Sequence, residues 1–80
     1  MAKEVSAGDN VEIIKRVVNR VAFYADAGTP GTTTITLEAG SVLPAAADEI
    51  GGNVTVLTNA GGKRLLVPLA EGEFRPAPQA

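Results

Sequence analysis

The stretch that decides the fold class runs from residue 53 to residue 69. It reads Asn53-Val54-Thr55-Val56-Leu57-Thr58-Asn59-Ala60-Gly61-Gly62-Lys63-Arg64-Leu65-Leu66-Val67-Pro68-Leu69. Its first part alternates, so Val54 and Val56 face one way, as in a half-buried strand. The glycine pair at 61–62 tolerates the positive φ of a tight hairpin turn. Residues 63–69 return as the second strand, and Pro68, which cannot donate to a ladder, marks a strand end or a sheet edge. The stretch predicts a β-hairpin.

The segments on either side continue this pattern of short strands and turns. Residues 27–31 form a turn, because proline fixes φ and glycine supplies positive φ. Residues 32–37 then alternate, with Ile35 and Leu37 on one face. Turns at 38–41 and 70–73 bound two further short extended pieces, at 42–44 and 74–75. The sequence therefore predicts a small all-β domain.

Residues 10–25 admit two interpretations. Apolar pairs at 13/14, 17/18 and 21/22 repeat every four residues, and Asp9 with Glu12 resembles a helix capping box. The apolar residues are, however, mostly β-branched or aromatic, and these favour strands. We favour a strand with a bend or bulge at Lys15-Arg16. The alternative is an α+β fold with a helix at about 10–26.

The composition argues against catalysis. The 80 residues include no His, Cys or Trp, one Tyr and two Phe. Ser6 and Ser41 thus have no histidine base, and the adjacent acids Asp48-Glu49 lack the ligand spacing of a cation loop. We expect no enzymatic activity, metal or cofactor. The three aromatic residues are expected in the core or at its edge: Phe23, Tyr24 and Phe74.

The charge is close to balanced, with nine acids, seven bases and a net charge of −2. A protein that binds nucleic acid through phosphates normally carries a basic stripe, so nucleic acid is an unfavoured partner. The bases most suited to contact an acidic partner, whether protein or nucleic acid, are Lys15, Arg16, Arg20, Lys63 and Arg64. Their commoner role is that of a solvated strand face.

The two ends differ from the middle. Residues 1–9 are polar and are expected to form an arm, and residues 75–80 contain two prolines that favour an extended tail. The domain is then expected at 10–74. No apolar run approaches the roughly 18 residues of a membrane span, and no hydrophobic signal region begins the chain, so a cytoplasmic protein is expected.

Three segments resemble parts of an SH3-like barrel. Residues 22–26 resemble its first strand and the start of the long first hairpin loop, residues 36–43 its diverging turn, and residues 67–72 the turn before its last strand. The resemblance covers about residues 20–76 and implies a small barrel. Binding of proline-rich peptides is not implied, because the tryptophan and tyrosines of that groove are missing.

In overall character the chain is also similar to small phage capsid decoration (cement) proteins. These are short, cysteine-free β domains rich in Ala, Gly, Thr and Val, and the segment 36–44 resembles turns found in several of them. The resemblance implies a structural protein of the virion, assembled in the host cytoplasm as a homo-oligomer or within a larger assembly. The alternative is a small barrel that binds nucleic acid or the ribosome through the basic residues named above.

Overall fold

The computed structural model describes residues 5–26, 28 and 30–77, and this part of the chain contains strands and no helix. The strands are β1 (Asn10–Ile13), β2 (Val17–Tyr24), β3 (Thr32–Leu37), β4 (Val42–Pro44), β5 (Val54–Ala60), β6 (Lys63–Leu69) and β7 (Phe74–Pro76). The prediction of an all-β fold is confirmed.

The hairpin from which the fold class was predicted is present as β5 and β6. They pair from Val54 opposite Leu69 to Ala60 opposite Lys63. Gly61 and Gly62 alone make the turn, with φ of 60° and 79°. Positive φ at both central residues defines the turn type that matches the twist of the two strands.

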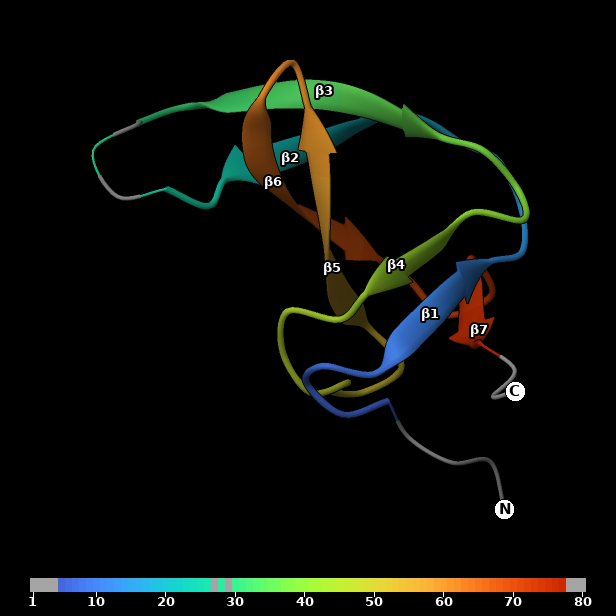
Figure 1. The fold of residues 1–80 in the computed structure, drawn as a ribbon. Coiled ribbons are helices and arrows are strands. Elements are labelled where there is room, and N and C mark those ends of the chain that lie inside the picture. Colours follow the sequence, from blue (N-terminus) through green and yellow to red (C-terminus); the bar gives the residue numbers. More distant parts are fainter. Residues whose placement is uncertain (1–4, 27, 29, 78–80) are drawn as a thin grey trace.

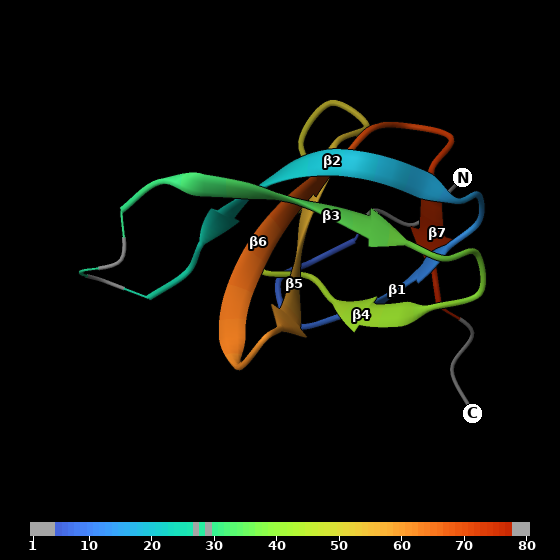
Figure 2. The ribbon, with the colours of Figure 1, turned by 90° about the horizontal axis from the view of Figure 1, so that it is seen from above.

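The strands form two antiparallel sheets (Figure 1). One has the order β4-β1-β7 and the other the order β3-β2-β6-β5. A single bridge between Ala45 and Val56 joins the end of β4 to β5. The strands β3 and β7 lie at opposite outer edges and do not pair, so the expected barrel does not close. In Figure 2 the start of β3 reaches beyond the ends of β5 and β6 at the left of the view.

Residues 10–25 form two strands, so the alternative of a helix at about 10–26 is wrong. The side chains of β1 alternate, with Val11 and Ile13 fully buried and Glu12 partly exposed between them. The chain bends at residues 14–16, and β2 then carries an irregularity between Val17 and Arg20. Asn19 takes the positive φ of 52° that this irregularity requires, a conformation that asparagine tolerates better than most residues. In residues 10–25 the strand preference of the β-branched residues therefore outweighed the helical signal of apolar pairs repeating every four residues.

The core lies between the two sheets. It is built from aliphatic side chains of β1 to β6 or their ends, from Val5 before β1 and from Phe74 of β7, with Tyr24, Ile35 and Leu43 packed against it. Phe74 is buried and Tyr24 partly buried, as expected from the sequence. Phe23 is half exposed and is not among the residues packed against the core, which corrects the prediction that it lies in the core or at its edge.

Part of each expected arm is integrated into the domain. Val5 is buried in the core. The Val5 N–H donates to the side-chain carboxylate of Glu49 at 3.1 Å, and the Val5 carbonyl accepts from the Glu49 backbone N–H at 2.8 Å. At the other end Arg75 and Pro76 pair with β1 as part of β7. The ordered domain thus extends beyond 10–74 to at least 5–77. The remaining arm and tail residues, 1–4 and 78–80, lie outside the described residues.

Candidate interaction surface

The four-stranded sheet buries one face and leaves the other accessible. Along β5 and β6 the buried positions are Val54, Val56, Leu65, Val67 and Leu69. The residues between them point the opposite way, because successive side chains of a strand alternate. Apolar residues occupy several of these positions too, so the accessible side of the sheet is itself apolar in part.

The most exposed apolar residues of this side lie on β2. Val21 and Phe23 are 47% and 50% exposed, while Ala22 between them is fully buried. Phe23 lies opposite Thr32 of β3 on one side and Leu66 of β6 on the other, and Leu66 lies opposite Leu57 of β5. One row of side chains therefore crosses all four strands. We call the apolar residues of this side the outer face: Val21, Phe23, Leu57, Leu66 and Pro68.

Threonines border the outer face. Thr34 lies opposite Val21, and Thr55 lies opposite Pro68. Thr32 and Thr34 are exposed, and Thr55 is partly so. A patch with apolar residues at its centre and polar groups at its rim has the composition of a protein-binding surface. The five residues of the outer face carry no charge, and the charge that borders them on β6 is Arg64, which lies two residues before Leu66 and pairs with Asp26.

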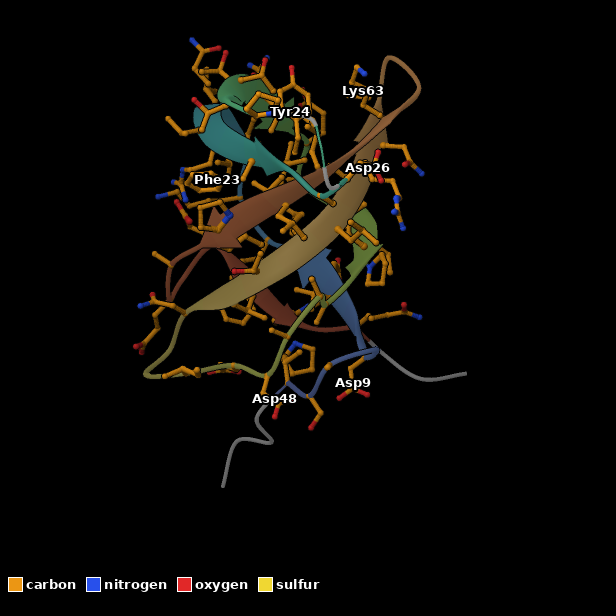
Figure 3. The ribbon with its side chains drawn as sticks, turned by 90° about the vertical axis from the view of Figure 1, so that its left-hand side faces the viewer. Asp9, Phe23, Tyr24, Asp26, Asp48 and Lys63 are labelled. Carbon is orange, nitrogen blue, oxygen red and sulfur yellow. The ribbon has the colours of Figure 1, made fainter. Side chains whose placement is uncertain are left out.

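The basic residues expected to make contacts are separated into two groups and are largely neutralised. Arg64 donates to Asp26 at 2.6 and 3.1 Å, near the β5–β6 turn. Figure 3 shows Lys63 at the tip of this hairpin, with Asp26 nearby. Arg16 pairs with Glu38 at 3.2 Å. Arg75, which the sequence did not single out, pairs with Glu12 at 2.9 Å.

Arg20 makes the most enclosed of these ion pairs. Its two terminal nitrogens donate to the two carboxylate oxygens of Glu73 at 2.9 and 2.6 Å, and it also donates to the Pro68 carbonyl at 2.9 Å. The side chains of Arg20 and Glu73 are only 30% and 14% exposed. The hydrogen bonds from Arg20 lower the pKa of Glu73, with a smaller effect from the charge of Lys15. The pair fixes β2 to the turn before β7. Arg20 therefore has a structural role within the domain.

Lys15 and Lys63 are the predicted contact residues for which no ion pair exists among the described residues. They lie on different parts of the molecule, Lys15 in the bend after β1 and Lys63 at the start of β6. The structure therefore does not combine the five predicted basic residues into one patch.

The acidic residues at the opposite end have a structural role. Asp48, Glu49 and Asp9 each accept a backbone N–H, from Ala7 at 2.7 Å, from Val5 at 3.1 Å and from Ser6 at 3.0 Å. Figure 3 shows Asp9 and Asp48 at the same end of the molecule. Within the described residues no group of three or more potential ligand side chains is placed to hold a metal ion. Asp48 and Glu49 attach Ala7 and Val5 to the loop after β4, whereas Asp9 closes a turn with Ser6.

The chain shows no significant similarity to known protein family models, to curated proteins or to solved structures. The described residues also contain no helix of the length and apolarity needed to cross a membrane.

The sequence analysis missed the outer face. Residues 21–24 are all apolar, so alternation could not show which of them point inward. The signal that was present is the uninterrupted apolar run at 65–69. A strand with apolar residues at successive positions is apolar on both faces, and only one of those faces can belong to the core of a two-layered domain.

Proposed function

We propose that this chain is a non-enzymatic structural protein that binds another protein through the outer face. Most concretely, it is a capsid decoration protein that stabilises an assembled phage capsid in the virion, which forms in the host cytoplasm. The observation that carries the proposal is the half-exposed pair Val21 and Phe23 on the regularly paired second half of β2, with Leu57 and Leu66 in the same face. The likeness of the sequence to small phage decoration proteins selects the capsid among protein partners.

The mechanism is mass action. A protein that binds an assembled lattice and not its separate subunits shifts the equilibrium toward the lattice. The outer face suits this role because its residues are held by strand pairing on both sides of β2. A surface held rigid before binding loses little conformational entropy when it docks.

Binding of nucleic acid or the ribosome is the alternative, and the ion pairs weigh against it. Arg16, Arg20 and Arg64 already bind carboxylates within the chain. A phosphate would have to share each guanidinium with a carboxylate whose negative charge repels it. A phosphate-binding protein also shows a steep loss of affinity with rising salt. Lattice binding through the outer face predicts only a shallow dependence.

The test uses capsid shells assembled from the major capsid protein encoded by the same genome. Phe23→Ser should lower co-sedimentation affinity by about tenfold or more, as expected for an aromatic residue at the centre of an interface. Val42→Ser is the matched control, because Val42 is 53% exposed on β4 of the other sheet. It should bind like the wild type.

Two results would overturn the proposal. One is a genome that encodes no capsid protein, or shells that do not bind the wild-type chain. The other is binding that is lost equally with Phe23→Ser and Val42→Ser, which would locate the contact elsewhere. Both variants should first show the wild-type unfolding curve.

A further inference from the structure

The strand β3 has one unprotected edge. It is the terminal strand of its sheet, and no strand of the described residues pairs with its outer side. Its sequence, Thr32-Thr33-Thr34-Ile35-Thr36-Leu37, contains no charge, proline or glycine. Such an edge offers unpaired N–H and C=O groups to another strand, and soluble proteins usually block it.

The other edge strands are short or partly covered, and β4 has three residues that end at Pro44. The outer side of β5 is covered at Thr55 and Val56, by the bridge from Ala45 to Val56 and by a bond from the Ala46 N–H to the Thr55 carbonyl at 2.8 Å. The strand β7 has three residues, two of which are Arg75 and Pro76. Charge, proline, shortness and coverage are the usual protections of an edge. β3, six residues long, has none of them.

The backbone groups on the free edge follow from the pairing of β2. The Ala25 N–H donates to the Arg64 carbonyl at 2.9 Å, so odd-numbered residues at this end of β2 direct their backbone groups toward β6. Even-numbered residues then face β3, where Ala22 lies opposite Thr33 and Arg20 lies opposite Ile35. Thr33 and Ile35 therefore bond β2. The residues of β3 whose N–H and C=O point away are Thr32, Thr34 and Thr36.

We propose that this edge pairs with the same edge of a second copy of the chain. The two β3 strands run antiparallel about a two-fold axis at Thr34, which makes Thr34 its own partner. Thr32 then lies opposite Thr36 of the second copy. The three residues whose backbone groups point to the free edge, Thr32, Thr34 and Thr36, thereby all form hydrogen-bonded pairs with the second copy. Each pair exchanges two N–H···O bonds. The inference is independent of the outer face and of any capsid.

The chemistry of the strand favours a second copy as the occupant. Glu38, the first charged residue after β3, falls opposite Pro30 of the second copy in this register, so no like charges face each other. The cross-strand neighbours on the outer side are threonines, a pairing that is favourable in sheets. On the inner side Ile35 meets Thr33 of the second copy. The edge is thus complementary to itself.

Thr34→Pro is the decisive variant. It removes an N–H that points away from β2, and a proline is tolerated in an edge strand at such a position. Sedimentation velocity from micromolar to millimolar protein should show a monomer–dimer equilibrium for the wild-type chain. Thr34→Pro should raise the dimer dissociation constant by about tenfold or more. Thr34→Ala keeps the N–H and loses only the threonine pair at the axis, so it should weaken the dimer clearly less than Thr34→Pro does.

Thr34→Lys provides a second route that does not alter the backbone. It keeps the N–H but brings two like charges together at the axis, so it should also weaken the dimer. Amide hydrogen exchange of the wild type then locates the contact. Protection of the Thr32, Thr34 and Thr36 amides should rise with protein concentration. Thr33 and Ile35, already bonded to β2, should change little.

Three results would overturn the proposal. The wild type could stay monomeric at millimolar concentration. A dimer could persist in folded Thr34→Pro and Thr34→Lys, which would place the contact on another surface. Trimers or open chains could form, which a two-fold pairing of one edge does not produce.

Discussion

The ion pair between Arg20 and Glu73 should contribute measurably to stability, because it is both bidentate and partly enclosed. Hydrogen bonds to charged groups contribute about 1.5–3 kcal/mol, whereas exposed ion pairs contribute about 0–1 kcal/mol. With side chains 30% and 14% exposed, the pair falls between these cases. We expect a coupling energy of about 1.5 kcal/mol between Arg20→Met and Glu73→Gln in a double-mutant cycle.

The cycle is measured by urea unfolding, with thermal unfolding as a second readout. Arg20→Met also loses the bond to the Pro68 carbonyl, so alone it should cost about 2 kcal/mol and lower the Tm by about 10 °C. The matched control is the pair Arg16 and Glu38, whose side chains are 62% and 64% exposed. Its coupling energy should stay below about 0.5 kcal/mol. Equal couplings for the two pairs would refute the argument from enclosure.

The coupling should also depend on pH, in a direction set by Glu73. The hydrogen bonds from Arg20 hold the pKa of Glu73 below its ordinary value. A carboxyl with a lowered folded-state pKa stabilises the fold fully above its unfolded pKa, about 4.3 for glutamate. This contribution is lost as the pH falls through the lower, folded-state pKa. The coupling energy should therefore be constant from neutral pH to about pH 5 and vanish in stronger acid. A coupling energy that stays unchanged in strong acid would mean that it does not depend on the ionised carboxylate of Glu73.

Two further predictions concern the hairpin turn and the N-terminal segment. Gly61→Val should destabilise the fold by about 1–2 kcal/mol in urea unfolding, because Gly61 has φ of 60° although a side chain there would meet no other atom. Gly61→Asn should lower the free energy of unfolding clearly less, because asparagine tolerates this φ. An equal loss for the two variants would contradict the argument that the positive φ disfavours valine. Val5→Ala should cost about 2 kcal/mol, because Val5 is buried in the core. An unchanged unfolding curve would mean that Val5 does not contribute to the core and that residues 5–9 form an arm outside the domain.

Local patterns were sufficient to predict most of the fold. Alternating residues indicated β3 and the first part of β5, and the glycine pair at 61–62 indicated that residues 63–69 return as β6, because both signals act over a few neighbouring residues. The burial of Val5 could not be predicted in this way. It depends on Glu49, which lies 44 residues away and binds the Val5 N–H. A single valine in a polar segment carries no local signal of such a contact.

The candidate sites were less predictable for the same reason. Arg20 and Glu73 are 53 residues apart, and Arg64 and Asp26 are 38 apart. The sequence therefore indicated five basic residues that could contact a partner. The fold brings a carboxylate to three of these five residues: Arg16, Arg20 and Arg64. The exposure of Phe23 depends on which face of β2 the second sheet covers. That choice is made by the tertiary arrangement and not by β2 itself.

The two proposed surfaces are compatible because they use different directions of the same sheet. The proposed edge pairing through β3 would add strands in the plane of the sheet, whereas a partner on the outer face would lie along the normal to the sheet. A two-fold axis through Thr34 perpendicular to the sheet places the outer faces of both copies on one side. Two linked faces bind a repeating lattice with an effective concentration that a single face lacks, provided that the spacing of the lattice sites matches. A dimer with individually weak faces could then attach firmly to an assembled shell and only weakly to a free subunit, which is the discrimination that lattice stabilisation requires.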